Sequence, residues 1–187
     1  MSPMVKLPLT LEHALLGFLS RRPMHAYEMY QTLQQARELG LVWHLKQSQL
    51  YVVLARLEEA GYITAFTQAQ GTRPPRRIMS LTSSGHDAFR RWLLTPVRHG
   101  RDFRQEFLAK LYFAQAEDPA GLAALVDGQR EVCQSWLADF ESRIDTIADE
   151  RVYDRLVLQF RAGQVRAILE WLDTCKATVA DAPLATR

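Results

Sequence analysis

The hydrophobic pattern changes its period between residues 62 and 81, and this change constrains the fold most strongly. On both sides, apolar residues recur at helical spacing, whereas residues 62–68 and 77–81 carry β-prone side chains. The segment between them, Gly71-Thr72-Arg73-Pro74-Pro75, predicts a long hairpin tip stiffened by proline. Because an isolated two-stranded hairpin is marginally stable in water, this one must pack against the neighbouring helices.

Helices are predicted on both sides of this hairpin. Apolar periodicity indicates one helix over residues 9–19, which Pro23 ends, and a second over about residues 25–38. A third runs from Ser48, its predicted N-cap, to the closing Gly61, and a fourth covers residues 88–94 after the hydroxyl-rich caps at 82–84. The second helix is expected to turn Tyr27, Tyr30 and Leu33 inward. The order helix, helix, helix, hairpin, helix predicts a mainly α fold with an α+β winged helix-turn-helix.

The third helix is the candidate for contacting DNA. The residues expected in its core face are Leu50, Val53, Leu54 and Leu57. The residues then left to face outward are Lys46, Gln47, Ser48, Gln49, Tyr51 and Val52, with Ala55 and Arg56 further along. Gln and Ser can bond base edges in a major groove, and Tyr and Lys can reach phosphate. The alternative is an ordinary solvated face, which predicts Glu and Lys pairs, yet the acids stand only at the far end, Glu58 and Glu59.

The hairpin tip is the second charged feature. Arg73, Arg76 and Arg77 fall within five residues, and no acid occurs between Ala60 and His86. These arginines can enter a minor groove or hold the flanking backbone; the alternative is charge that protects a sheet edge from aggregation. Residues 1–92 hold 11 basic and 6 acidic side chains, whereas residues 93–187 hold 12 and 15. A basic half suggests a polyanionic partner, although chance can also produce such an imbalance.

The pattern of the second half predicts a dimerisation module. A short helix is expected to end before Asp118-Pro119, with Asp118 as the next cap, followed by long helices over about residues 119–148 and 150–179. The pair predicts an antiparallel hairpin whose wide apolar faces need a partner, and a second copy is the simplest one. The predicted interface residues are Leu122, Leu125, Val132, Trp136, Phe140, Leu156, Phe160, Ile168 and Trp171. The alternative is a monomeric helical extension. We therefore expect a DNA-binding domain over residues 1–96 and a helical, coiled-coil-like dimerisation domain over residues 97–187.

Several stretches resemble the PadR family of transcription regulators. They are Leu9-Thr10-Leu11-Glu12-His13-Ala14-Leu15-Leu16-Gly17-Phe18-Leu19, Pro23-Met24-His25-Ala26-Tyr27-Glu28-Met29, Ser48-Gln49-Leu50-Tyr51, Arg56-Leu57-Glu58-Glu59-Ala60-Gly61-Tyr62-Ile63 and Leu81-Thr82-Ser83-Ser84-Gly85. Ala26 replaces the family's usual Gly, and Pro74-Pro75 departs from its usual wing. The resemblance implies that Tyr51 is the DNA-binding tyrosine and that Arg73, Arg76 and Arg77 form the basic wing. The long second half is similar to the subgroup that contains the virulence activator AphA.

The resulting expectation is a cytoplasmic, homodimeric repressor that binds double-stranded DNA at a pseudo-palindromic operator. The alternatives are an activator that works with a partner regulator and a winged-helix scaffold for protein interaction. No motif supports an enzyme, a metal site, a cofactor or a membrane span, and Cys133 and Cys175 read as buried thiols rather than redox sensors. Family relatives imply an effector pocket for a small aromatic compound, lined by Trp92 or Trp136, although large aromatics at helical spacing are more often core.

Overall fold

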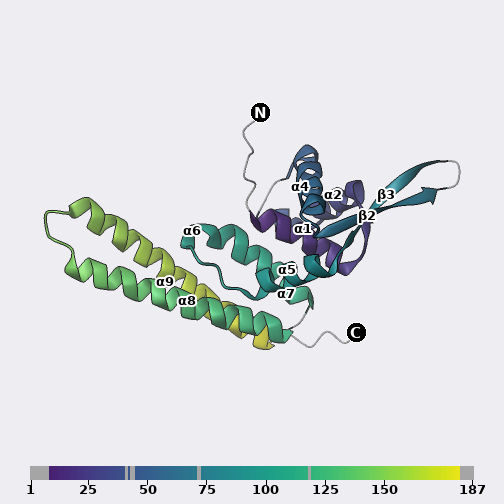
Figure 1. Cartoon of the computed structure of the whole chain (residues 1–187). Helices are drawn as coiled ribbons and strands as arrows, with labels where there is room; N and C mark the ends of the chain where they lie inside the picture. Colours follow the sequence, from purple (N-terminus) through teal and green to yellow (C-terminus); the bar gives the residue numbers. More distant parts are fainter. Residues whose placement is uncertain (1–8, 41, 43–44, 71–72, 118, 182–187) are drawn as a thin grey trace. The chain divides into compact units, whose positions relative to one another are not determined.

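The computed structural model describes residues 9–40, 42, 45–70, 73–117 and 119–181, and the predicted order of elements is present (Figure 1). The chain forms two compact units. One comprises the described residues up to Leu94 together with Arg104–Phe113, and the other comprises Thr95–Phe103 with the described residues from Ala114 onward. The sequence-based division assigned all of residues 97–187 to the second domain, whereas Arg104–Phe113 packs with the first unit.

The first unit contains a three-stranded antiparallel sheet. Strands β1 (Met24–His25), β2 (Ile63–Gln70) and β3 (Arg73–Leu81) lie in the order β1-β3-β2. Ile63 pairs with Leu81, and the register shifts between Gln68 and Gln70. The hairpin is longer than predicted, because Arg73, Pro74 and Pro75 belong to β3 rather than to the tip. Proline has no amide hydrogen to donate to a neighbouring strand. It is tolerated here because β1 pairs only with Ile78 and Met79, so that edge of β3 has no described neighbour beside the prolines.

The helices that accompany the sheet in the described residues up to Leu94 are α1 (Leu9–Arg21), α2 (Ala26–Gln35), α3 (Arg37–Gly40), α4 (Gln47–Glu59) and α5 (Ser83–Leu94). The single second helix that we predicted is wrong at both ends, because His25 lies in β1 and the chain leaves helical geometry at Ala36. Gly61 has φ +74°, as expected for a left-handed helix cap. Gly85 allows α5 to start against the hairpin, since a Cβ there would lie 2.0 Å from the carbonyl oxygen of Tyr62.

The core of this unit joins α1, α4 and α5. Leu15, Phe18 and Phe89 are buried, and Phe113 contributes from α7 (Leu108–Glu117). Phe113 meets the rings of Phe18 and Phe89 edge to face, each with ring centroids 5.5 Å apart. All four residues predicted to form the core face of α4 are buried. This packing holds α4 by one side and leaves its other side open.

The second unit is built on two long antiparallel helices, α8 (Pro119–Thr146) and α9 (Val152–Asp181), which confirms the predicted helical hairpin (Figure 1). Ion pairs between the two helices show that they run antiparallel, because the residue numbers of the partners in α9 decrease as those in α8 increase. They join Asp127 to Lys176, Arg130 to Asp173 and Glu141 to Arg166. The short helix α6 (Gly100–Asp102) and the π-helical stretch η1 (Phe103–Phe107) precede α7. The cap predicted at Asp118 lies outside the described residues.

A buried amide fixes the segment that follows α5 within this unit. Gln129 of α8 is fully buried, and its Oε1 accepts a hydrogen bond from the Val97 amide at 2.6 Å. Its Nε2 donates to the Val97 carbonyl oxygen at 3.2 Å. The side chain therefore satisfies both backbone groups of a buried residue, as a neighbouring strand would.

Candidate nucleic-acid interface

The side of α4 that faces away from the core is a row of exposed side chains, which we call the α4 outward face. Its members are Gln47, Ser48, Gln49, Tyr51, Val52 and Ala55. Tyr51 is 45% exposed and Val52 is 55% exposed. None of these six residues carries a charge, so the first turns of the helix offer hydrogen bonds and apolar contact, whereas the exposed Glu59 places an acid on the same side in the last turn.

The start of α4 differs from the prediction. The N-cap is Lys46 rather than Ser48, and Gln49 Oε1 accepts a hydrogen bond from the Lys46 amide at 3.0 Å. The helix therefore begins at Gln47, and the hydroxyl of Ser48 is left on the outward face. Capping holds the carbonyl oxygen of Gln49 against the backbone, so the side chain must leave the cap before it can present both its oxygen and its amide group to adenine.

Two arginines that we predicted to contact DNA pair with acids of the protein. Arg56 Nη2 lies 3.1 Å from Glu12 Oε1, which joins α4 to α1. Arg77 Nη2 lies 2.5 Å from Glu58 Oε1, which joins β3 to the last turn of α4. These contacts hold α4 between α1 and the hairpin. They also give each guanidinium group an acidic partner within the protein, which the sequence could not indicate because the partners are far apart along the chain.

Lys46 and Arg76 are the remaining cations of the predicted set that can be described. Both are exposed, and in the portion of the chain that the structure covers neither has an ion-pair partner within 4 Å. The side chain of Arg73 lies outside the described residues. Successive side chains of a strand point to opposite faces, so Arg76 and Arg77 occupy different faces of the hairpin. The predicted cluster of wing arginines is therefore divided.

Tyr27 is a candidate that the sequence reasoning placed wrongly. We expected it to face inward, but it is 49% exposed, in the first turn of α2. Of the other residues predicted to face inward, Leu33 is buried and Tyr30 is partly covered; α2 also buries Ala26 and Met29, so its buried residues are Ala26, Met29 and Leu33. These three have the spacing i, i+3 and i+7, a signal that was visible in the sequence. His25 Nδ1 accepts a hydrogen bond from the Tyr27 amide at 3.1 Å and caps this helix.

Trp92, one of the two predicted effector-pocket residues, lies in a packed cluster. The His13 ring stacks on it with centroids 5.4 Å apart, and Lys110 Nζ lies 5.3 Å from the centre of the indole ring. Lys110 is 1% exposed and pairs with Glu106 at 2.6 Å; burial lowers the pKa of this lysine, against the opposing effect of Glu106. The indole Nε1 of Trp92 is buried and finds no hydrogen-bond partner among the residues that the structure describes. Trp136, the other predicted residue, belongs to the second unit.

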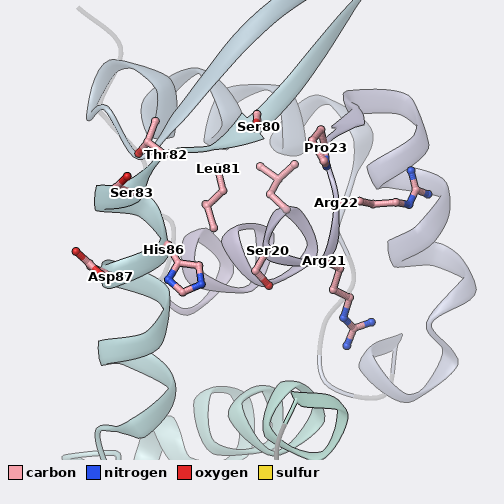
Figure 2. Close-up of a pocket in the computed structure, with 11 residues that line it drawn as sticks. Ser20, Arg21, Arg22, Pro23, Ser80, Leu81, Thr82, Ser83, His86 and Asp87 are labelled. Carbon is pink, nitrogen blue, oxygen red and sulfur yellow. The ribbon is translucent and has the colours of Figure 1, made fainter. Parts of the chain in front are cut away.

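A cleft of about 500 Å³ lies elsewhere in the first unit, between the end of α1, the end of β3 and the start of α5 (Figure 2). In Figure 2, His86 and Asp87 lie on one side and Arg21 and Arg22 on the other. Both arginines are engaged: Arg21 lies over the Tyr112 ring at 5.5 Å, and Arg22 pairs with Glu28 at 2.6 Å. The two arginines that line this cleft are thus already engaged within the protein.

The second unit exposes apolar side chains along one side of α9. Toward α8 this helix buries Leu158, Ala162, Val165 and Leu172. On the other side lie Val152, Leu156, Phe160 and Trp171, which we call the α9 exposed stripe. Phe160 is 66% exposed, and Trp171, which also meets the Phe103 ring, is 36% exposed.

The predicted interface residues therefore separate into three groups. Leu156, Phe160 and Trp171 belong to the stripe, whereas Val132, Trp136, Phe140 and Ile168 are partly covered. Leu122 and Leu125 are buried in the single chain and offer no surface to a second copy. Their helical periodicity was recognised correctly, but periodicity does not tell a core residue from an interface residue.

The described part of the chain offers little support for a metal site, a membrane span or a reactive thiol. No group of three or more His, Cys, Asp or Glu side chains there is arranged to hold a metal ion. Among the same residues, no helix combines the length and apolar character of a membrane span. Burial raises the pKa of the Cys133 thiol, opposed by a hydrogen bond from Gln129, and burial also raises the pKa of Cys175. Both thiols are therefore poor nucleophiles at neutral pH.

Known proteins resemble both units. The curated proteins that match include the negative transcriptional regulator PadR of Bacillus subtilis, 28% identical over 137 residues, which are 73% of this chain and 74% of that protein. A probable transcriptional regulator of Mycobacterium tuberculosis is 27% identical over 183 residues, covering 88% of this chain and 95% of that protein. The crystal structure of Bacillus subtilis PadR in complex with operator DNA is similar with a TM-score of 0.47 and 24% identity, covering 92% of this chain and 99% of that one.

Family descriptions match the two halves separately. The transcriptional regulator PadR-like family matches residues 15–91, and the virulence activator alpha C-terminal family matches residues 103–180. The first of these is a family of transcription regulators, which agrees with the expectation that the chain is not an enzyme. The chain therefore carries a winged-helix domain of the transcriptional regulator PadR-like family over residues 15–91, followed by a region of the virulence activator C-terminal type over residues 103–180.

Proposed function

We propose that this regulator is a homodimer that binds a pseudo-palindromic operator through α4 and the β2–β3 hairpin and represses transcription by occupying promoter DNA. The observation that carries the proposal is the α4 outward face: an exposed, uncharged surface on a helix that the core and two ion pairs hold firmly. The curated PadR relative is a negative regulator, which supports repression as the outcome of binding.

Each exposed group has a role in this proposal. Gln47 and Ser48 contact base edges in the major groove, and Tyr51 and Lys46 contact phosphate oxygens beside it. Arg76 reaches DNA from the hairpin. The start of α4 adds the backbone amides of Gln47 and Ser48, since those of Gln49 and Leu50 already donate to the Lys46 carbonyl oxygen, and such amides favour a phosphate. Arg56 and Arg77 act indirectly, because their ion pairs orient α4 and the hairpin rather than leaving two free charges.

Dimerisation uses the α9 exposed stripe. Val152, Leu156 and Phe160 are each more than half exposed, and a two-fold related copy of the same stripe would cover them. A two-fold axis also supplies two α4 helices. If these lie about 34 Å apart, they enter successive major grooves on one side of a duplex.

A fluorescence-polarisation titration tests the proposal. The probe is duplex DNA from upstream of the protein's own coding sequence, and affinity should fall steeply between about 50 and 200 mM salt as condensed counterions are released. Tyr51→Ala should weaken binding while sedimentation still shows a dimer. Absence of binding at about 50 mM salt would reject this function, and loss of the dimer in Tyr51→Ala would reassign Tyr51 to a structural role.

A second candidate is activation together with a partner regulator. It is favoured by one observation, the match of residues 103–180 to the C-terminal region of virulence activators. A reporter on the target promoter separates the two: deletion of the gene raises expression if the protein represses and lowers it if the protein activates.

A small aromatic effector stays a prediction. In its support, the Trp92 indole N–H is buried with no acceptor among the described residues, a donor that a hydrogen-bond acceptor on a ligand would satisfy. Saturable quenching of tryptophan fluorescence by small aromatic compounds, absent in Trp92→Phe, would test it.

A further inference from the structure

The middle of the α4 outward face is a row of small or apolar side chains. Ser48, Val52 and Ala55 follow the spacing i, i+4 and i+7, which places them along one line of the helix opposite its buried residues. All three are exposed. Val52, at 55%, is the most exposed large apolar side chain among the described residues up to Leu94.

The flanks of this row are occupied by contacts within the protein. On one flank Glu58 pairs with Arg77, and on the other Arg56 pairs with Glu12. These pairs leave the row itself uncovered. The row also lacks the side chains that identify guanine in a major groove, since neither arginine nor lysine is among its members.

Helix stability does not explain a valine at this position. A β-branched residue loses side-chain freedom in a helix, so Lys, Gln or Ala would stabilise an exposed position better. Burial does not explain it either, because more than half of the side chain is exposed. In the major groove, however, the 5-methyl group of thymine is the apolar feature that an aliphatic side chain can recognise.

We propose that Val52 contacts the 5-methyl group of a thymine, so that each operator half-site requires an A·T pair at the position facing this residue. The inference rests on the proposed function, because it assumes that α4 enters the major groove. Ser48 and Ala55 are short enough to let the helix approach the base pair closely. The contact distinguishes thymine from cytosine without a hydrogen bond.

Replacement of thymine by deoxyuridine tests the contact, because it removes only this methyl group and preserves base pairing. The probe is a duplex that the protein selects from a random-sequence pool, resynthesised with deoxyuridine at each thymine in turn. At one position per half-site, affinity of the natural protein should fall about fourfold, the effect of losing one buried methyl group, and about fifteenfold when both half-sites are changed. At other positions the change should be small.

The variant Val52→Ser should bind thymine and deoxyuridine duplexes with equal affinity, and it should match the natural protein on the deoxyuridine duplex. The control Ala60→Ser changes an exposed residue just beyond α4 and should keep the full discrimination. A natural protein that is insensitive to deoxyuridine at every position, or a Val52→Ser variant that still discriminates, would overturn the contact while leaving DNA binding intact. Failure to select any duplex would overturn both the contact and the proposed function.

Discussion

Gln129→Leu isolates the stabilising effect of one buried amide. The leucine has a similar volume but cannot bond the Val97 amide and carbonyl, which the native side chain meets at 2.6 and 3.2 Å. Val97 is only 1% exposed, so water cannot replace the lost partner without opening the structure. Each buried backbone group left without a partner costs about 1 to 3 kcal/mol, so the variant should lose about 2 to 6 kcal/mol of unfolding free energy.

Urea denaturation followed by circular dichroism measures this loss, and the melting temperature should fall by about 4 to 24 °C for a chain of this size. Hydrogen exchange gives the local readout, since the Val97 amide should lose its protection. The matched control Gln134→Leu alters an exposed residue of the same helix and should change stability by less than about 0.5 kcal/mol. If Gln129→Leu is as stable as this control, the reasoning about Val97 is refuted.

Three further outcomes are expected. Arg76→Ala should lower the slope of log affinity against log salt concentration by about two per dimer in polarisation titrations. Arg77→Ala should lower this slope less, because Arg77 already pairs with Glu58. Equal losses of slope would contradict the ion-pair assignment. Phe160→Glu should shift sedimentation from dimer to monomer at micromolar concentration, and an unchanged dimer would exclude the α9 exposed stripe as the interface. Lys110→Met should destabilise the protein, because it leaves the largely buried Glu106 carboxylate without the ammonium group with which it pairs. The pKa of Lys110 is lower in the folded than in the unfolded state, so the free energy of unfolding should rise as pH increases from the folded pKa toward 10.5. Denaturation at several pH values should show that this rise is absent from the variant.

Local patterns were sufficient to predict most elements. The four inward residues of α4, the change to a period of two in the hairpin and the two long C-terminal helices depend on side chains a few positions apart, and all are present in the structure. Strand β1 was missed because two residues have no detectable period. The break in the second helix at Ala36 was missed because neither glycine nor proline marks it.

The candidate interface shows the limit of such patterns. Which residues form the α4 outward face follows from helical spacing, so the sequence by itself determined the uncharged side chains that α4 presents. Whether a charge on or near this face is free depends on contacts across the fold: Arg56 meets Glu12, and Arg77 meets Glu58. Likewise, only the tertiary structure separates the buried Leu122 from the exposed Phe160. The physical reason is the same in each case: periodicity records which way a side chain points, but burial and pairing depend on residues that folding brings near from distant parts of the chain.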